Sequence, residues 1–263
     1  VRGWHWLASA ASAPLLSRGG APSPFSASFS LVYSLMFAWL DPSKARTIRP
    51  LRQHTGGTLR LHRLSRSTLG TGHLRDAVAL PEGEDRNEWV AALTIDFFND
   101  INMVYGMVAD FCTDGCCPVM NAGPKVQYKW ADGREYKTPV AVSAPKYVEL
   151  LLAWVQRHLD DQALFPTAPG VPFPPDFMDQ ARNIFRRLFR VYAHVYHNHY
   201  ERIVSHQFEP HLNTCFKHFV YFVIEFGLIP KEELRPLQEL IDKLLEEDKA
   251  KHAPAPAPPP EAA

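Results

Sequence analysis

Apolar residues recur at spacings of three and four over most of residues 80–247, and this period predicts amphipathic α-helices. The longest such face follows a cluster of acidic residues and comprises Trp89, Val90, Leu93, Phe97, Ile101, Val104 and Val108. Capping residues and proline positions predict four more helices: 145–159 after Ser143, a long helix from Asp176, Pro210–Phe226 and Lys231–Glu247.

Two alternating segments flank a glycine-containing turn near the middle of this region. They read V-Q-Y-K-W (126–130) and R-E-Y-K-T (134–138), with A-D-G between them. Alternation of period two on both sides of a turn predicts a β-hairpin. The predicted fold class is therefore mainly α, a helical bundle with a small β-hairpin.

Charge divides the chain into a basic leading part and a mildly acidic body. Residues 1–75 hold ten Lys/Arg and one acidic residue, whereas the remainder holds 18 basic and 27 acidic residues. We therefore predict that residues 41–79 form a basic flexible arm with one short helix at 59–66, and that residues 80–247 form the folded domain. An acidic body does not suggest non-specific nucleic-acid binding.

The two ends of the chain differ in composition from this body. Residues 1–40 resemble a transit peptide or a mispredicted exon, and residues 248–263 are rich in Ala and Pro, so we predict that both are disordered. The longest strongly apolar run, at 29–40, is too short to span a bilayer, so no transmembrane segment is predicted.

Three of the four cysteines, Cys112, Cys116 and Cys117, lie within six positions of one another. Clustered cysteines with distant histidines indicate a metal site more than a disulfide framework. The histidines occur on the long helix predicted around residues 184–200, at His194, His197 and His199.

Two thiolates and two imidazoles would form a closed tetrahedral Zn²⁺ site that ties the cysteine loop to this helix. The residues alone are compatible with several ligand sets. On a regular helix His194 and His197 share a face, whereas His194 and His199 are about 140° apart, and Cys116 competes with Cys117. The alternative is a set of free cysteines and surface histidines.

Two charged clusters are candidate binding surfaces. Arg186, Arg187 and Arg190 fall within about 100° of arc on the long helix, where they suit a phosphate group or form an ordinary solvated face. The acidic cluster before Trp89 suits either the positive end of the helix dipole or a basic partner, and it comprises Glu82, Glu84, Asp85 and Glu88.

Longer motifs resemble the Mob (Mps one binder) family of kinase activators, most closely its founding class. They follow one another over about residues 64–246 and read L-P-E-G-E-D-x-N-E-W, F-F-N-x-I-N-M-x-Y-G, D-F-C-T-x-x-x-C-P-V-M, V-P-F-P, R-L-F-R-V-Y-A-H-V-Y-H-N-H-Y and H-L-N-T-x-F-K-H-F.

This resemblance implies a helical bundle with a structural zinc ion, whose ligands correspond to Cys112, Cys117, His194 and His199. The pair of histidines differs from the pair that helix geometry favours. It requires the long helix to end or distort near His199.

The resemblance also implies roles for the two charged clusters. The basic positions Arg186, Arg187 and Arg190 correspond to a phosphothreonine pocket that docks an upstream Hippo-type kinase. Glu84 and Glu88 correspond to a surface for the basic N-terminal regulatory region of NDR/LATS-type kinases.

Two threonines of the arm match phosphorylated positions of the family, Thr68 closely and Thr47 more weakly. Phosphate at these positions adds negative charge to a basic segment, and we expect it to release that segment from the acidic surface.

The expected function is that of a non-enzymatic adaptor and allosteric co-activator of NDR/LATS-type kinases, cytoplasmic and also nuclear. One alternative is a structural scaffold that binds partners without activating a kinase. Another is a zinc hydrolase, but two thiolates and two imidazoles leave no open coordination position, and no H-E-x-x-H motif occurs.

Overall fold

The computed structural model describes residues 49–69, 74–168 and 170–251, and these ranges are mainly helical. The elements in chain order are α2 (Gly57–Leu69), α3 (Leu74–Val78), α4 (Arg86–Gly106), α5 (Ala144–Asp160), α6 (Phe177–Asn198), α7 (Tyr200–Ser205), α8 (Glu209–Glu225), α9 (Lys231–Leu234), the 3-10 helix η2 (Arg235–Leu237) and α10 (Gln238–Lys251). Within these ranges no helix is long and apolar enough to cross a membrane. The predicted disordered segment 1–40, Thr47 and the tail beyond Lys251 lie outside the described residues.

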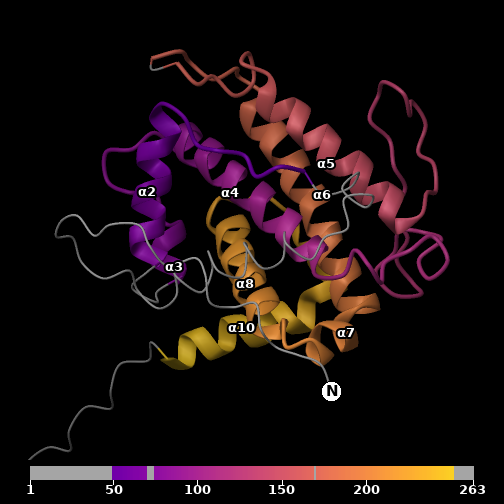
Figure 1. The fold of residues 1–263 in the computed structure, drawn as a ribbon. Coiled ribbons are helices and arrows are strands. Elements are labelled where there is room, and N and C mark those ends of the chain that lie inside the picture. Colours follow the sequence, from indigo (N-terminus) through magenta and orange to yellow (C-terminus); the bar gives the residue numbers. More distant parts are fainter. Residues whose placement is uncertain (1–48, 70–73, 169, 252–263) are drawn as a thin grey trace, which may run out of the picture.

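Helix α4 is the central element of the bundle. The side chain of Asp85 accepts hydrogen bonds from the backbone N–H groups of Asn87 and Glu88, and so begins the helix. Buried side chains occur on every side of α4, which is the pattern of a helix enclosed by others. Helices α2, α5, α6 and α8 all contact it (Figure 1).

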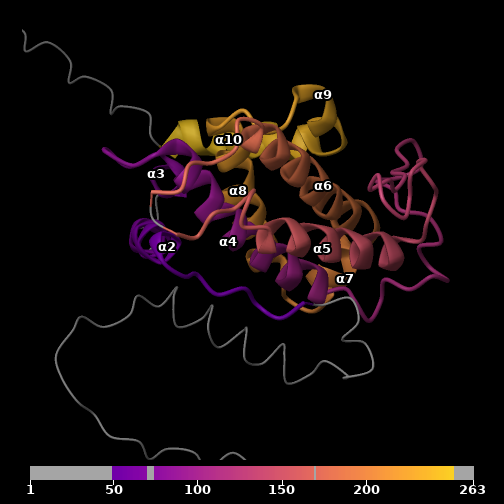
Figure 2. The same cartoon turned by 90° about the horizontal axis from the view of Figure 1, so that it is seen from above.

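Helices α5 and α6 lie side by side in both views of the fold (Figures 1 and 2). Ser143 caps α5 as predicted, because its hydroxyl accepts the N–H of Lys146 at 3.4 Å. Aromatic rings fill the core where α4, α6 and α8 meet. The ring of Phe97 lies 5.6 Å from that of Phe185 and 5.5 Å from that of Phe219.

Part of the predicted basic arm packs on the bundle, with α2 against α4 and α3 against α8. The extended residues before α2 are fixed by polar side chains of α4. The backbone N–H of Arg49 donates to Asn102 Oδ1 at 3.0 Å, and Arg52 exchanges two hydrogen bonds with the side chain of Asn99. We refer to residues 49–69 as the strap, because they cross α4 and contact it along their length.

The predicted β-hairpin at 126–138 is wrong. The described residues contain two isolated antiparallel bridges in this region and no hairpin ladder; the bridged pairs are Asn121–Gln127 and Trp130–Val140.

The side chain of Asp132 explains why the hairpin does not form. Its carboxylate accepts the backbone N–H groups of Arg134 at 2.8 Å and Tyr136 at 2.9 Å, and its own N–H donates to Tyr136 O at 3.0 Å, so Asp132 closes a tight turn through both side chain and backbone. Pro139 then lacks the N–H that a continuing ladder needs. The segment is a loop that is held in place by the buried indole of Trp130.

The C-terminal region differs from the single helix predicted over Lys231–Glu247. Pro236 interrupts it, because proline has no N–H for an intrahelical hydrogen bond. The result is the short helix α9, the turn η2 and then α10, which continues to Lys251. Glu233, on α9 before this break, lies beside α6.

Candidate metal centre and charged surfaces

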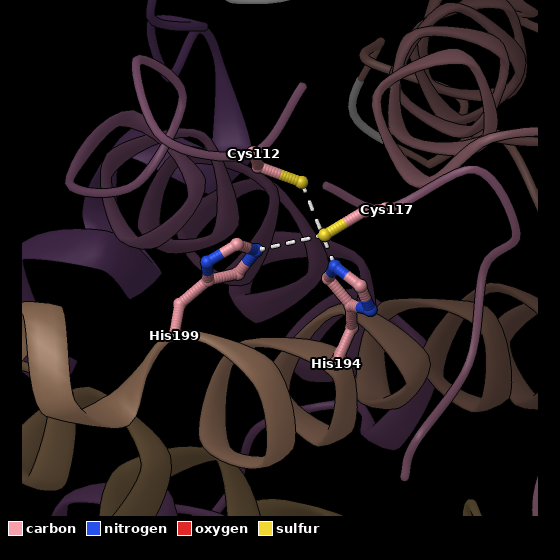
Figure 3. Close-up of side chains that lie close together, drawn as sticks. All are labelled: Cys112, Cys117, His194 and His199. Atoms are coloured by element: carbon pink, nitrogen blue, oxygen red, sulfur yellow. Dashed lines mark hydrogen bonds between the residues drawn. The ribbon is translucent and has the colours of Figure 1, made fainter. Parts of the chain in front are cut away.

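The four predicted zinc ligands come together in one buried cluster (Figure 3). Cys112 and Cys117 lie in the turns after α4, His194 lies on α6, and His199 follows the end of α6. One ligand atom from each residue lies within 4.8 Å of the others. The Cys112 Sγ–His194 Nε2 and Cys117 Sγ–His199 Nε2 distances are both 3.5 Å.

Backbone turns hold the two cysteines. The N–H of Cys112 donates to Val108 O at 2.8 Å, which continues one helical turn beyond α4. The carbonyl of Cys117 accepts the N–H of Ala144 at the start of α5. The cysteine loop is therefore connected to both α4 and α5 before any metal binds.

The end of α6 positions the two histidines. The helix ends at Asn198, and His199 has φ −131° and ψ 2°, outside the helical region. The prediction that the helix ends or distorts near His199 is confirmed. This break turns the His199 imidazole back towards the thiols.

The competing ligands lie elsewhere. His197 Nε2 lies 2.8 Å from Pro236 O, so this ring faces η2 instead of the thiols. Cys116 is exposed, and its thiol donates to Phe111 O at 2.9 Å. The helix break thus directs His199 and not His197 to the thiols. Cys116 Sγ lies 3.0 Å from Cys117 Sγ, but its exposure sets it apart from the buried cluster.

The electrostatics of the cluster match a site for a thiophilic cation. Burial raises the pKa of the Cys112 thiol to about 11 and raises the pKa of the Cys117 thiol further above its usual range. Burial also lowers the pKa of His199 to about 4 and lowers the pKa of His194, so both rings are neutral at pH 7. Neutral imidazoles are ready to bind a metal, whereas the thiols release protons when it binds.

An outer hydrogen bond orients His194. Its Nδ1 lies 2.8 Å from Asn121 O, which acts as the acceptor and leaves Nε2 directed at the thiols. Such a second partner is usual for a metal-bound histidine. The donor set and its burial fit Zn²⁺, which favours two thiolates and two imidazoles in a closed tetrahedral shell.

The three arginines of α6 have different partners. Arg186 Nη2 lies 2.5 Å and Arg190 Nη2 lies 4.0 Å from the two carboxylate oxygens of Glu233 on α9. Arg190 Nη1 also donates to the Tyr147 hydroxyl at 2.9 Å. Sequence reasoning missed Glu233, because nothing in the local pattern shows that α9 packs beside α6.

Arg187 contacts aromatic rings. Its guanidinium carbon lies 4.8 Å from the centroid of a Trp130 ring and 4.5 Å from that of a Trp154 ring. Its Nη2 donates to Ala131 O at 2.8 Å. Burial lowers the pKa of Arg187 from its usual value. The predicted triplet is thus divided into two arginines on a carboxylate and one in an aromatic pocket.

The acidic cluster before α4 is also divided. Asp85 caps the helix, Glu88 is exposed, and Glu84 pairs with a residue of the strap. Arg60 on α2 makes two contacts with the Glu84 carboxylate, of which the Nη1–Oε1 distance is 2.6 Å. This pair raises the pKa of Arg60. Thr68 lies on the same helix as Arg60.

These features define an all-helical domain with a buried Cys₂His₂ cluster that can hold a metal ion. Residues 66–237 match the model of the Mob1/phocein family. The chain therefore belongs to the Mob1/phocein family.

Curated relatives share this domain over nearly their whole length. MOB kinase activator-like 1A of Arabidopsis thaliana is 54% identical over 202 residues, which cover 76% of this chain and 94% of the relative. MOB kinase activator-like 1 homolog B of Dictyostelium discoideum is 53% identical over 211 residues, 80% of this chain and 98% of the relative. Both are named as activators of kinases.

Proposed function

We propose that this protein is a non-enzymatic adaptor that co-activates a protein kinase of the NDR/LATS type. The kinase-activator names of its relatives support the kinase, and the acidic start of α4 supports the docking surface. The observation that carries the proposal is the Arg60–Glu84 pair. Arg60 of this chain pairs with the Glu84 carboxylate. A basic residue of a kinase segment can form the same ion pair with that carboxylate.

The test is the activity of a purified NDR/LATS-type kinase with and without the full chain. Stimulation is the expected result, and Glu84→Lys with Glu88→Lys should abolish it, since both changes reverse the charge of the surface. Binding without stimulation would favour the structural scaffold. No binding at all would overturn the adaptor.

The arginine group supports a second docking site, for phosphothreonine of an upstream Hippo-type kinase. Arg186 and Arg190 both face the Glu233 carboxylate, which occupies a position suited to an anion. Among the described residues, Arg186 Nε and the Tyr128 hydroxyl are buried without a hydrogen-bond partner. We infer that phosphate displaces Glu233, while Arg187 adds positive charge from its aromatic pocket. A phosphothreonine peptide should bind, and its unphosphorylated counterpart should not.

The strap supports a phosphorylation switch at Thr68. Phosphate adds about two negative charges to α2, which weakens its attraction to the acidic start of α4. Phosphorylation of Thr68 should therefore raise the affinity for a basic kinase peptide, and Arg60→Ala should reproduce the effect without phosphate. Equal affinities for all three forms would overturn the switch. Thr47 belongs to the same proposal but lies outside the described residues.

The metal proposed for the Cys₂His₂ cluster is Zn²⁺, and its role is structural. Bound there, it would join the cysteine loop to the end of α6 and supply no reaction centre, because four protein ligands fill the shell. Metal analysis of chelator-free protein should give about one zinc per chain. A zinc content near zero would overturn this assignment. It would not decide the roles of the two docking surfaces, which are tested separately.

A further inference from the structure

A second group of metal-ligating side chains joins the strap to α4. His54 precedes α2, His62 lies on α2, and Asp96 lies on α4. One ligand atom from each lies within 4.8 Å of the others. His54 Nε2 is 3.0 Å and His62 Nδ1 is 2.8 Å from the same oxygen, Asp96 Oδ1. The two imidazoles stack with a centroid distance of 4.0 Å.

This group is largely shielded from solvent. The exposed fractions of the His54, His62 and Asp96 side chains are 5%, 22% and 18%. His62 Nδ1 is buried and lies 2.8 Å from Asp96 Oδ1, and His54 Nε2 lies 3.0 Å from the same oxygen. Two imidazole nitrogens and a carboxylate oxygen therefore converge at one largely shielded point, and these are ligand atoms that a divalent transition-metal ion binds.

The spacing of the atoms also agrees with metal coordination. Metal–nitrogen and metal–oxygen bonds of about 2.0–2.2 Å place two ligands at right angles about 2.9 Å apart, and tetrahedral ligands about 3.4 Å apart. The two distances to Asp96 Oδ1, 3.0 and 2.8 Å, are close to the first value. Small side-chain movements would therefore suffice to admit an ion.

We propose that His54, His62 and Asp96 form a second site, for a divalent transition-metal ion, which clamps the strap to α4. Imidazole and carboxylate ligands suit Zn²⁺, Co²⁺ and Ni²⁺. Three protein ligands leave coordination positions for water, so this site binds more weakly and exchanges faster than the Cys₂His₂ cluster. The clamp opposes release of the strap from α4.

The test is a Co²⁺ titration of the full chain at about pH 7.5, where histidine is mostly neutral. With zinc in the Cys₂His₂ cluster, the expected result is one Co²⁺ per chain with weak ligand-field absorption and no thiolate charge-transfer band, because this site has no sulfur ligand. Zinc-free protein should take up a second Co²⁺ with thiolate bands, which report the Cys₂His₂ cluster separately, so failure of either site is visible without the other.

Two variants test the ligands directly. His54→Ala with His62→Ala should weaken the thiolate-free binding by at least about 100-fold, more than loss of an outer partner usually does. Asp96→Asn, which keeps the size of the side chain, should also weaken it. Exposed His206 provides the matched control, and His206→Ala should leave the titration unchanged.

Two outcomes would overturn the site. One is the absence of thiolate-free Co²⁺ uptake by the unaltered chain, which would leave Asp96 as a hydrogen-bond acceptor for the two histidines. The other is equal uptake by the unaltered chain, by Asp96→Asn and by the double histidine variant, with circular dichroism showing that all three are folded.

Discussion

Two parts of α6 carry functional side chains in opposite environments. In the C-terminal half, His194 is 0% exposed and His199, just beyond its end, is 5% exposed, and both face thiols of a distant loop. In the part of α6 that precedes the histidines, the side chains of Arg186 and Arg190 are 40% and 23% exposed and share the carboxylate of Glu233. The histidines are held by buried contacts to the cysteine loop, whereas the arginines share a partly exposed carboxylate that we propose a ligand replaces.

The difference shows how one helix can serve both stability and recognition. Arginine retains its charge when a ligand replaces its carboxylate partner, whereas a buried imidazole has no alternative partner in solvent. Under the proposed function, the buried histidine part of α6 sets the position from which the arginines meet a ligand. Substitutions in the two parts should separate stability from binding.

The largest expected effect is at the metal cluster. Cys112→Ser removes a predicted ligand and should cost about 4 kcal/mol of unfolding free energy, because loss of a metal site is among the most severe single changes. The corresponding fall in Tm is about 8–16 °C for a domain of this size. Calorimetry provides the measurement. Cys116→Ser is the matched control and should shift stability by no more than about 0.5 kcal/mol; equal effects would contradict the ligand assignment.

The second effect separates the neighbouring arginines. Arg187→Ala removes a guanidinium held between Trp130 and Trp154 and should cost about 2 kcal/mol, through lost cation–π contact and packing. Arg186→Ala removes a partly exposed ion pair and should cost less than about 1 kcal/mol. Urea unfolding of both variants measures the difference. If both cost the same, Arg187 does not have the supporting role that its pocket indicates.

The sequence predicts most of the helices because their apolar faces are long and regular, as in α6, where Ala181, Ile184 and Leu188 are buried. It also indicates the residue types of the metal cluster. It does not show whether His197 or His199 joins His194 in the metal cluster. Helix geometry favours His197, but the choice depends on where α6 ends. The family resemblance supplies His199, and the conformation of that residue supplies the physical reason.

The partners of the charged clusters are harder to predict. Arg186 on α6 meets Glu233 on α9, and Arg60 meets Glu84 through the packing of α2. Both pairs depend on how separate elements dock, which a single-segment pattern does not contain. The false hairpin has a similar origin, because one side chain, Asp132, competes with the ladder that the alternation predicts.

The third effect tests whether Glu233 is exchangeable. Glu233→Gln removes its charge and should raise the affinity for a phosphothreonine peptide about fivefold, equivalent to about 1 kcal/mol. Arg190→Ala should lower that affinity instead. Calorimetric titration with a phosphorylated peptide measures both. Glu232→Gln is the matched control on the same short helix, and tighter binding by this variant would show that general charge, and not the Glu233 position, is responsible.

The smallest effect concerns pH at the aromatic pocket of Arg187. The ring of His158 lies against Trp154 with a centroid distance of 4.0 Å, and its Nδ1 donates to Trp154 O at 2.8 Å. Burial lowers the pKa of His158, and the positive charges of Arg157, Arg134 and Arg187 lower it further, although the hydrogen bond to Trp154 opposes them. The neutral ring is thus favoured in the folded state.

Because the folded pKa of His158 lies below the unfolded value, its contribution to stability is present above the unfolded pKa and is lost as pH falls towards the folded pKa. Unfolding free energies at about pH 7.5 and about pH 5.5, on either side of the ordinary value of about 6.5, measure this loss. His158→Gln keeps an amide donor for Trp154 O and should lose less stability over the interval. Arg187→Ala should also reduce the loss, since protonated His158 would no longer face that guanidinium. An unchanged pH dependence of the unfolding free energy in both variants would contradict this prediction. It would mean that the aromatic pocket of Arg187 accepts protonated His158 without loss of stability.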